Sequence, residues 1–549
     1  DSVTGDRTEF LGRNGSYRLP DALRRFNLSG TTGPGLDPCG AVQKKLTLSP
    51  GQEVELVFVL GWSDGTQSVA DVLAPFSSTE QVHAAMYANA ASWNQTLEAI
   101  EVETPNRAFD VLVNKWLLYQ TLSCRVWGRS AFYQSGGAFG FRDQLQDVMA
   151  LVYCRPEVAR ETILRAASRQ FEPGDVQHWW HPPSGRGVRT RFADDYLWLP
   201  YVVSHYVATT GDAAILDEQI PYLQSFPLEP HEEERYELPE ISPLVENLYQ
   251  HCLRSIDHGF RFGSHGLPLM GCGDWNDGMN KVGAGGQGES VWMGWFLRVV
   301  LQQFIPLVEA RGDAERANVF RTQAENLLTT VEREAWDGQW YRRAYTDDGT
   351  PLGSRDSDEC RVDSIAQSWS VIAGADPQRR KTAMRSLEQH LVLPDDQLVL
   401  LLTPPFDKSQ VNPGYIKGYP PGIRENGGQY THAALWAIHA LALEGRGTRA
   451  VELFDMINPV LKCGQPELEQ RYRVEPYVVA ADVYGPPAHT GRGGWTWYTG
   501  SAAWMYRVAV ESILGIQLRD DRLRVSPRIP ASWSEYAVTI RRGRTVWRV

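Results

Sequence analysis

The sequence predicts a mainly α-helical fold with β-structure at both ends of the chain. Three observations lead to this prediction. Apolar residues recur at helical spacing in about a dozen segments through the middle of the chain. Alternating apolar and polar residues, which are typical of strands, occupy roughly the first 65 residues and return in the tail. Loops rich in glycine, proline and aromatic residues separate the helical segments, as in a barrel of helix pairs that presents a site at one end.

The β-like beginning of the chain contains two predicted strands. Residues 44–48 and 54–60 alternate in polarity on either side of a turn at 49–52. The pattern changes from strand-like to helical near residue 75. We therefore predict three regions: a partial β-sandwich and linker over 1–75, a helical barrel over 76–515 and a β-segment over 516–549.

Each predicted helix is a segment in which apolar residues recur at spacings of three and four. We expect helices over 81–100, from 105 onward, and over 156–169, 193–209, 244–255, 291–310, 314–334, 363–373, 378–389, 431–445, 448–457 and 501–514. In the tail, residues 523–527 and 537–549 return to strand-like alternation.

Size and charge narrow the possible functions. At 549 residues the chain exceeds the roughly 250 to 300 residues that one core usually serves, so several layers or domains are expected. We see no apolar run approaching the roughly 20 residues that span a bilayer, which predicts a soluble chain without a transmembrane segment. The net charge of −12 argues against a nucleic-acid partner, although it is compatible with a local basic site for a small anion. A neutral substrate fits this balance better.

The seven cysteines are scattered and show no CxxC spacing, so they indicate neither a disulfide framework nor a zinc site. Reduced thiols, and with them a cytoplasmic location, are the simplest interpretation. The chain begins at Asp1 without a signal-like segment, so any targeting segment is either absent or outside this sequence.

The most informative stretch runs from Gly271 to Asn280, where two carboxylates, Asp274 and Asp277, flank Trp275 in a glycine-rich loop. Breaking a glycosidic bond requires an acid that protonates the leaving oxygen, beside a wall that grips the sugar ring. The alternative is that both aspartates only cap a turn and a helix start. A second polar segment, residues 139–147, favours the first interpretation because it again sets charged groups among aromatics and glycines.

The run His178-Trp179-Trp180-His181 has the HxxH spacing of some metal sites. We find no third ligand in a fitting pattern. We therefore expect a role in a substrate loop or in packing, and no metal.

Four loops together carry a family resemblance: the two segments above, Glu425 to His432, and Trp497 to Ser501. They resemble glycoside hydrolase family 94, the inverting β-glucoside phosphorylases. The resemblance implies an (α/α)6 barrel flanked by an N-terminal partial β-sandwich and a short C-terminal β-segment. It also implies cleavage of a β-glucoside by inorganic phosphate, giving α-glucose 1-phosphate and a shortened acceptor. Residues 1–61 look most similar to the C-terminal phosphorylase region of cyclic β-1,2-glucan synthases, while cellobionic-acid and cellobiose phosphorylases leave a β-1,4 linkage open.

The resemblance assigns a role to each candidate site residue. Asp277 would be the general acid, with Asp274 as its nearest rival. The substrate-binding residues would be Arg142, Asp143, Trp275, Glu425 and Gln429, with Tyr133 and Lys417 on the acceptor side. The phosphate would be held by His432, Thr499 and Gly500. The alternatives are a helix-start histidine for His432 and an ordinary helix cap for Thr499 and Gly500.

These roles are chemically reasonable because phosphate brings its own nucleophilic oxygen, so one protein acid is enough. An inverting hydrolase needs a second carboxylate roughly 6.5 to 9.5 Å away to activate water. The pKa of Asp277 would have to lie above the usual value of about 3.9, and we expect Trp275, Asp274 and the incoming phosphate to raise it. A protonated His432 would add positive charge to the phosphate site.

Two other functions stay open: an inverting hydrolase with Glu425 as base, and a non-catalytic glucan-binding region of a larger synthase. No metal or organic cofactor is expected, since inorganic phosphate is a co-substrate. The expected partners are a β-glucoside or β-glucan and phosphate. The resemblance further suggests a homodimer, and a place within a larger polypeptide at the cytoplasmic face of a membrane-bound synthase.

Overall fold

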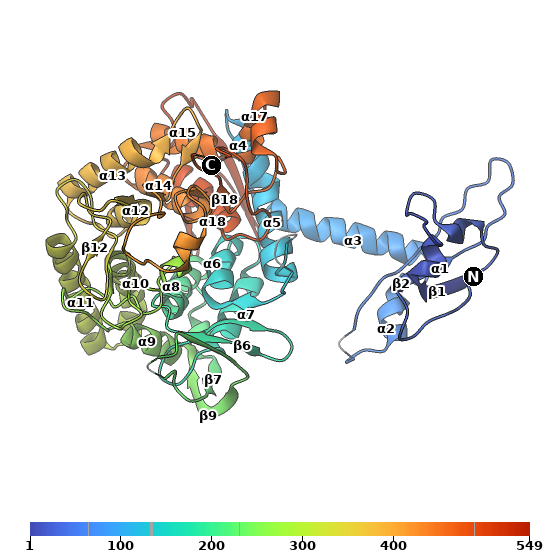
Figure 1. The fold of residues 1–549 in the computed structure, drawn as a ribbon, viewed down its shortest axis with the longest axis horizontal. Coiled ribbons are helices and arrows are strands. Elements are labelled where there is room, and N and C mark those ends of the chain that lie inside the picture. Colours follow the sequence, from blue (N-terminus) through green and yellow to red (C-terminus); the bar gives the residue numbers. More distant parts are fainter. Residues whose placement is uncertain (64, 132–134, 230, 488) are drawn as a thin grey trace. The chain divides into compact units, whose positions relative to one another are not determined.

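The computed structural model describes residues 1–549 except 64, 132–134, 230 and 488. The chain divides into two compact units, Asp1–Ser92 and Trp93–Val549 (Figure 1).

The first unit is built on one antiparallel strand pair, β1 (Ser2–Asp6) with β2 (Pro38–Gln43). Short helices α1 (Arg7–Leu11) and α2 (Val69–Leu73) follow, and α3 (Thr79–Leu97) begins in this unit. Helix α3 agrees in type with the predicted helix over 81–100.

The strands predicted over 44–48 and 54–60 are wrong. The turn between them is present, because the Gln52 amide donates to the Ser49 carbonyl at 2.9 Å, but residues 44–60, all of which the structure describes, contain no strand. A strand needs a hydrogen-bonded partner as well as alternating side chains. Leu48 and Phe58 from the two predicted strands are 54% and 64% exposed, so no packing against a second layer replaces that partner.

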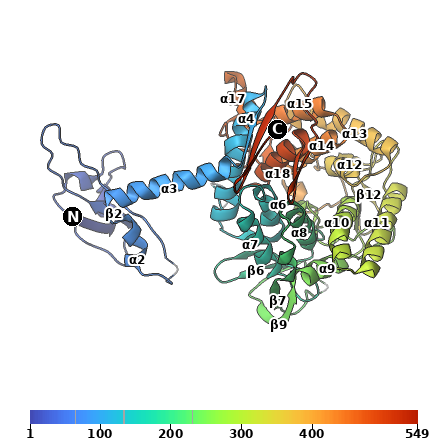
Figure 2. The same cartoon turned by 180° about the vertical axis from the view of Figure 1, so that it is seen from behind.

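Among the described residues, six helices of the second unit contact one another in a closed series (Figure 2). In order they are α6 (Phe141–Leu151), α8 (Trp198–Thr210), α10 (Val291–Ala310), α12 (Ser364–Ile372), α14 (Thr431–Leu443) and α18 (Ser501–Arg507). Helix α18 packs back on α6 and closes the series. These helices are apolar nearly all round because neighbours surround them, as the sequence THAALWAIHALAL of α14 illustrates.

A second set of helices packs outside this ring. They are α7 (Pro156–Ala167), α9 (Leu248–His258), α11 (Ala314–Glu334), α13 (Pro377–Leu391) and α15 (Gly447–Ile457). In α11, Ala317, Phe320, Ala324, Leu327 and Val331 are buried at spacings of three and four. An outer helix therefore buries one stripe and leaves the other face to solvent.

Most predicted helices are confirmed in type, and α10 and α11 have the predicted bounds. The predicted helix over 244–255 begins too early. Residues 244–247 belong to β9 (Glu240–Asn247), which pairs with β7 (Gln219–Gln224). The Asn247 side chain then accepts from the Gln250 amide at 3.0 Å and starts α9 at Leu248.

The expectation that no apolar run approaches membrane-spanning length is also wrong. Helix α10 is long and apolar enough to cross a membrane by length and composition alone. Most of it is buried among the other helices, because it belongs to the inner ring.

Small strands complete the second unit. β4 (Phe139–Gly140), β5 (Gln177–His181), β6 (Arg186–Thr190) and β8 (Glu234–Glu237) form one sheet. In the tail, β19 (Ile516–Arg519) pairs with β20 (Arg522–Val525), and β21 (Ala537–Arg542) lies between β22 (Thr545–Arg548) and β3 (Ile100–Glu103). The strands predicted in the tail are thus confirmed.

Candidate active site

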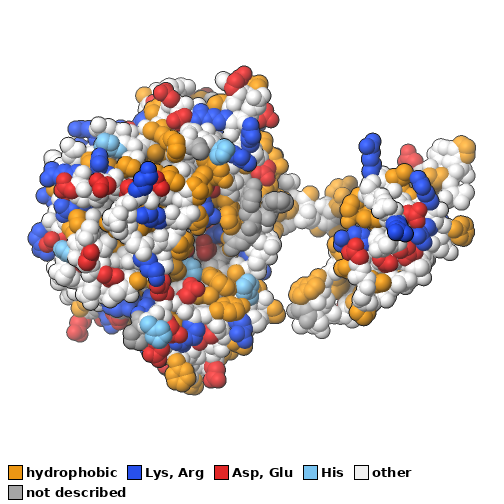
Figure 3. Space-filling model, viewed as in Figure 1, with side chains coloured by type: hydrophobic (Ala, Val, Ile, Leu, Met, Phe, Trp, Pro, Cys, Tyr) orange, Lys and Arg blue, Asp and Glu red, His pale blue; other side chains and the backbone are white. Residues whose placement is uncertain are grey.

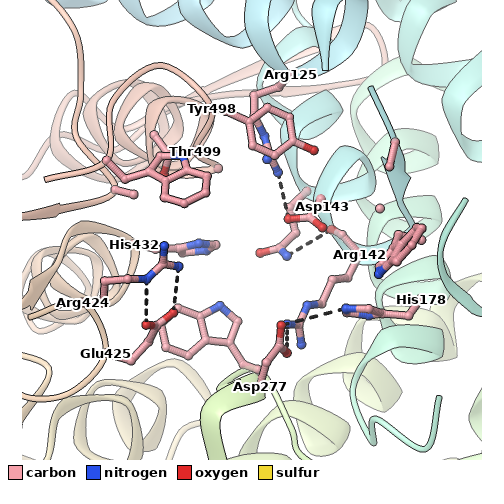
Figure 4. A pocket seen from close by; sticks show the side chains of 18 of the residues that line it. Arg125, Arg142, Asp143, His178, Asp277, Arg424, Glu425, His432, Tyr498 and Thr499 are labelled. Carbon is pink, nitrogen blue, oxygen red and sulfur yellow. Dashed lines mark hydrogen bonds and ion pairs between the residues drawn. The ribbon is translucent and has the colours of Figure 1, made fainter. Parts of the chain in front are cut away.

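A cavity of about 390 Å³ lies where the inner helices α6, α14 and α18 begin (Figure 4). The loops that precede the inner helices supply most of its wall, because each of them ends at the first turn of a ring helix. The site therefore depends on the ring for its geometry and on the loops for its chemistry.

The two aspartates of the loop Gly271 to Asn280, the acid loop, have different surroundings. Asp274 is fully buried and accepts from Arg343 at 2.6 and 2.7 Å and from the Ser290 hydroxyl at 2.6 Å. Burial opposes ionisation, but the Arg343 guanidinium and its hydrogen bonds hold the pKa of Asp274 below its usual range. Asp274 thus anchors the loop and does not line the cavity.

Asp277 projects into the cavity, and about a third of its side chain is exposed. It begins a 3₁₀ turn capped by the Asn276 side chain, and Met279 of that turn packs with Ile416 in a small buried cluster. Burial raises the pKa of Asp277, and the nearby Asp195 carboxylate adds to the rise, while Arg142 and His178 oppose it. The predicted direction is confirmed, but the neighbouring carboxylate that contributes is Asp195 and not Asp274.

The Arg142 guanidinium, at the first turn of α6, is shared among several acceptors. Its Nη1 donates to both oxygens of Asp194 at 2.8 and 3.0 Å and to the Asp274 carbonyl at 3.0 Å. Its Nη2 donates to Asp277, and its Nε lies 3.6 Å from Asp195. One arginine therefore serves three carboxylates next to the acid loop.

Arg125 occupies the opposite wall, beside Tyr498 and Thr499 (Figure 4). Its side chain is buried, donates to Asp147 at 2.7 Å and to Asp143 at 2.9 Å, and lies over the Tyr498 ring at 4.2 Å. Burial raises the pKa of Asp147 to about 7 despite this arginine, and the second oxygen of Asp147 has no hydrogen-bond partner among the described residues.

His432, Thr499 and Gly500 complete that wall, so the predicted phosphate residues lie together. A Cβ built on Gly500 would be 3.6 Å from both the His432 ring and Asp147 Oδ1, and the His432 Nε2 atom is buried without a hydrogen-bond partner in the part of the chain that the structure describes. Both α14 and α18 begin here, and the first turns of helices favour anions. The Arg125 guanidinium, Thr499 and the first turns of α14 and α18 therefore meet at one corner, where the Thr499 hydroxyl donates to Ser501 at 2.9 Å.

The expectation that a protonated His432 supplies charge is wrong. Burial, together with the nearby Arg125 guanidinium, lowers the pKa of His432 to about 3. The imidazole is neutral at physiological pH, and the positive charge of this corner comes from Arg125.

Trp275, which belongs to the acid loop, and Glu425 form the wall between Asp277 and the corner around Arg125. The Trp275 ring contacts Tyr430 at 5.3 Å and His432 at 5.4 Å between ring centres. Glu425 pairs with Arg424 at 3.2 Å. This wall offers an aromatic face next to polar groups, which suits a sugar ring.

The structure brings eight predicted residues to the cavity: Arg142, Asp143, Trp275, Asp277, Glu425, His432, Thr499 and Gly500. It does not bring two others. The Lys417 ammonium donates to the Ser409 carbonyl at 2.6 Å, and the buried Gln429 side chain accepts from the Val399 amide at 3.2 Å, so neither lines the cavity. Tyr133 lies outside the described residues.

Sequence reasoning missed Arg125 and Arg424, and it gave His178 no chemical role. Arg125 stands in an apolar helical segment, Thr121–Gly128, where a lone arginine is usually read as a solvent-facing residue. The Arg125 side chain is only 3% exposed in the structure, so it is a buried residue and does not face solvent. His178 lies on β5, where its Nδ1 atom is 2.8 Å from Asp195.

Within the described residues, no group of three or more histidines, cysteines, aspartates and glutamates is arranged to hold a metal ion. All seven cysteines are free. Basic and acidic side chains are interspersed over the face shown in Figure 3. That face carries no broad field of one sign, which a polyanionic partner would need.

Comparisons with known proteins agree on one family. The model of the glycosyl hydrolase 94 superfamily catalytic domain matches residues 92–515, and that of the glycosyl hydrolase 94 supersandwich domain matches residues 1–79. The cyclic β-(1,2)-glucan synthase NdvB of Rhizobium meliloti is 47% identical over the whole chain, which spans 19% of that relative's length. The N,N'-diacetylchitobiose phosphorylase of Vibrio proteolyticus is 29% identical over 98% of this chain and 68% of the relative.

Among solved structures, a GH78 family rhamnosidase of Bacillus sp. GL1 matches with a TM-score of 0.54 and 15% identity. The match covers 81% of this chain and 39% of that one. At this identity the similarity shows a shared fold alone.

Proposed function

This chain belongs to the glycosyl hydrolase 94 superfamily, and we propose that it cleaves a β-glucoside by inverting phosphorolysis, giving α-glucose 1-phosphate and a shortened acceptor. One observation carries the proposal. A single cavity holds a carboxylic acid with a raised pKa, Asp277, and a separate corner built for an anion around Arg125. We further infer that the closed series of six helices is the inner ring of an (α/α)6 barrel.

The anion corner takes the place of a general base. Phosphate placed between Arg125, His432 and Thr499 would receive charge-assisted and neutral hydrogen bonds and would attack the anomeric carbon with its own oxygen. Because the attack comes from the face opposite the departing oxygen, the configuration inverts.

Asp277 would protonate the departing oxygen. A carboxyl group does this near neutral pH only if its pKa is raised, and burial together with Asp195 raises it. Trp275, Asp143 and Glu425 would hold the glucosyl unit between the acid and the phosphate. In this arrangement Arg142 donates a hydrogen bond to Asp277 and also lines the sugar site.

The hydrolase alternative needs Glu425 to act as a free base. Glu425 is held in an ion pair with Arg424 at 3.2 Å on the cavity wall, so its carboxylate is not free to orient a water. The paired state of Glu425 therefore favours phosphorolysis over hydrolysis.

We propose a β-1,2-linked glucan as the first donor to test, because the relative that is 47% identical over the whole chain is named a cyclic β-(1,2)-glucan synthase. The chain spans a fifth or less of that relative, so membership in a larger polypeptide is part of the proposal. Inorganic phosphate is the only co-substrate that this chemistry requires. A homodimer and a cytoplasmic location are further expectations from the resemblance.

The test is an assay of α-glucose 1-phosphate after incubation with inorganic phosphate and, separately, a β-1,2-glucan, cellobiose or cellobionic acid. We expect phosphate-dependent product from one donor, and its loss in Asp277→Asn. Glucose released at the same rate without phosphate would support the hydrolase. Binding of a donor without turnover would support a non-catalytic glucan-binding region.

A further inference from the structure

We propose that His178, held by Asp195, is a positioning residue that stores the proton used by Asp277 and passes it to that carboxylate before each bond cleavage. The inference rests on the proposed function, because it gives Asp277 the role of general acid.

His178 lies between Asp277, with which it lines the cavity, and Asp195, which is buried behind it. His178 Nδ1 is 2.8 Å from Asp195 Oδ2, and His178 Nε2 is 3.9 Å from Asp277 Oδ2 (Figure 4). Asp195 is 1% exposed, so its carboxylate fixes the ring with Nε2 directed at Asp277. The 3.9 Å gap exceeds a hydrogen bond, and gaps of this kind commonly shorten when substrate fills a site.

The packing leaves His178 no other acidic partner within ion-pair distance among the described residues. Its ring lies 4.7 Å from the Phe192 ring, which covers the other side. The charged groups that act on it are Asp195 and Asp277, which favour the imidazolium, and Arg142, which disfavours it. Asp143 is also close enough to be influenced by it.

These charges explain why the pair of His178 and Asp277 holds a proton. Asp194, Asp195 and Asp277 surround a single arginine, so three carboxyl groups share one positive charge and carry an excess of negative charge, although burial raises the pKa of Asp194 to about 7. A proton on His178 reduces that excess. Burial opposes it, but Asp195 and Asp277 raise the pKa of His178 to about 9, so the ring is protonated at neutral pH.

The proposed step balances. The proton moves from His178 Nε2 to Asp277 Oδ2, which converts an ion pair into two neutral groups as the sugar displaces water. Asp277 gives that proton to the glycosidic oxygen, which keeps the electron pair of the broken bond, while a phosphate oxygen bonds to the anomeric carbon. The phosphate ester releases its own proton to solvent, and His178, about 13% exposed, takes one up.

The experiment compares two donors in His178→Gln. A sugar leaving group needs protonation, whereas the leaving group of 2,4-dinitrophenyl β-glucoside does not. We expect kcat to fall about 100-fold on the β-1,2-glucan, within the range usual for general-acid assistance, and less than about threefold on the aryl glucoside. A structural role for His178 would lower both rates by similar factors, and that result would overturn the inference.

A second readout is the pH profile with the natural donor. In the wild-type protein the pair of His178 and Asp277 loses its proton only when the pH exceeds the pKa of His178. We therefore expect the alkaline limb of kcat, the pH range in which kcat falls, to lie lower by about one unit or more in His178→Gln. Asp195→Asn, which leaves the ring but weakens its anchor, should shift the limb in the same direction. An alkaline limb that stays unchanged in both variants would contradict the inference. Because this readout uses the natural donor, it applies even if the aryl glucoside is not turned over.

His265→Gln is the matched control. His265 also pairs with a buried carboxylate, Glu289, and stacks on Tyr345 at 4.0 Å, but it does not line the cavity. Its substitution should leave the donor ratio and the alkaline limb unchanged. If wild type itself forms no glucose 1-phosphate from any donor, the proposed function fails; if wild type is active and the ratio is unaffected by His178→Gln, only this inference fails.

Discussion

The two ends of the helix ring enclose cavities of similar size, and each contains a carboxylate beside an arginine. At the ends where the inner helices begin, the cavity is about 390 Å³ and contains Asp277 with Arg142. At the opposite ends, the cavity is about 310 Å³ and contains Glu511 with Arg507. The pKa of Asp277 is raised, whereas that of Glu511 is lowered.

The difference lies in how each arginine is shared. Arg507 donates to Glu511 at 2.8 and 3.0 Å, and the Tyr153 hydroxyl adds a donor at 3.0 Å, which outweighs the effect of burial. Arg142 divides its donors among three carboxylates, so burial prevails at Asp277. An arginine that serves one carboxylate keeps it ionised and structural, while an arginine shared by several leaves one of them able to carry a proton.

The largest expected effect tests the reactive end. Asp277→Asn should lower the rate of glucose 1-phosphate formation about 10²- to 10⁴-fold, since general-acid assistance is lost. The free energy of unfolding, measured by urea denaturation, should not fall, because the substitution removes one of several carboxylates that lie close together. A loss above about 2 kcal/mol would show that Asp277 is structural, as Glu511 is.

The opposite end should respond in the reverse way. Glu511→Gln leaves Arg507 buried without a charged partner and is expected to cost about 3 kcal/mol of unfolding free energy while kcat stays near wild type. The same denaturation and activity assays check it. Asp274→Asn is a related variant at the reactive end, since Asp274 is paired with a buried arginine, Arg343, which also lies 3.3 Å from Asp363. A stable Glu511→Gln enzyme with lost activity would break the comparison.

Arg125→Lys tests whether phosphate and sugar bind to separate parts of the cavity. The phosphate part is the anion corner of Arg125, His432 and Thr499, and the sugar part is the sugar wall of Trp275, Arg424 and Glu425. Lysine keeps the charge but loses the fork that reaches Asp143 and Asp147, so we expect the KM for phosphate to rise about 10- to 100-fold, equivalent to about 1.5 to 3 kcal/mol. The KM for the donor should change less than about threefold in the same initial-rate measurements. Arg424→Lys, on the sugar wall, should show the opposite preference. Equal changes in both constants for both variants would contradict the division.

The smallest effect concerns the pH dependence of stability. Burial lowers the pKa of His439 to about 4, below its usual 6.5. The unfolded chain therefore binds a proton that the folded chain does not, so stability is complete above about pH 6.5 and falls as pH drops towards 4. In His439→Gln the fall in unfolding free energy between pH 7 and 5 should be smaller by about 1 to 2 kcal/mol. Identical slopes for variant and wild type would refute this assignment.

The helices could be predicted because their signals are local. Helix α11 has a continuous apolar stripe and a start at Asp313, whose side chain accepts from the Arg316 amide at 3.0 Å. The strands predicted over 44–60 failed because alternation describes one strand and says nothing about a partner. Whether a ladder forms depends on other segments, which a single stretch of sequence does not specify.

The same limit applies to the candidate site. The sequence placed Asp274 and Asp277 in one glycine-rich loop, and only the family resemblance ranked Asp277 above Asp274 as the acid. The residue that separates them, Arg343, is 69 positions from Asp274 in the chain. Arg125 was missed for a related reason, because its burial comes from tertiary contacts and not from its own helical segment.

The most direct test of the central claim, that an anion corner replaces a general base, is the product of one reaction. Wild-type protein, a β-1,2-glucan and inorganic phosphate would be followed by phosphorus and proton NMR. We expect α-glucose 1-phosphate as the first product, formed only with phosphate and strongly reduced in Arg125→Lys at low phosphate. Free glucose appearing equally fast without phosphate would contradict it.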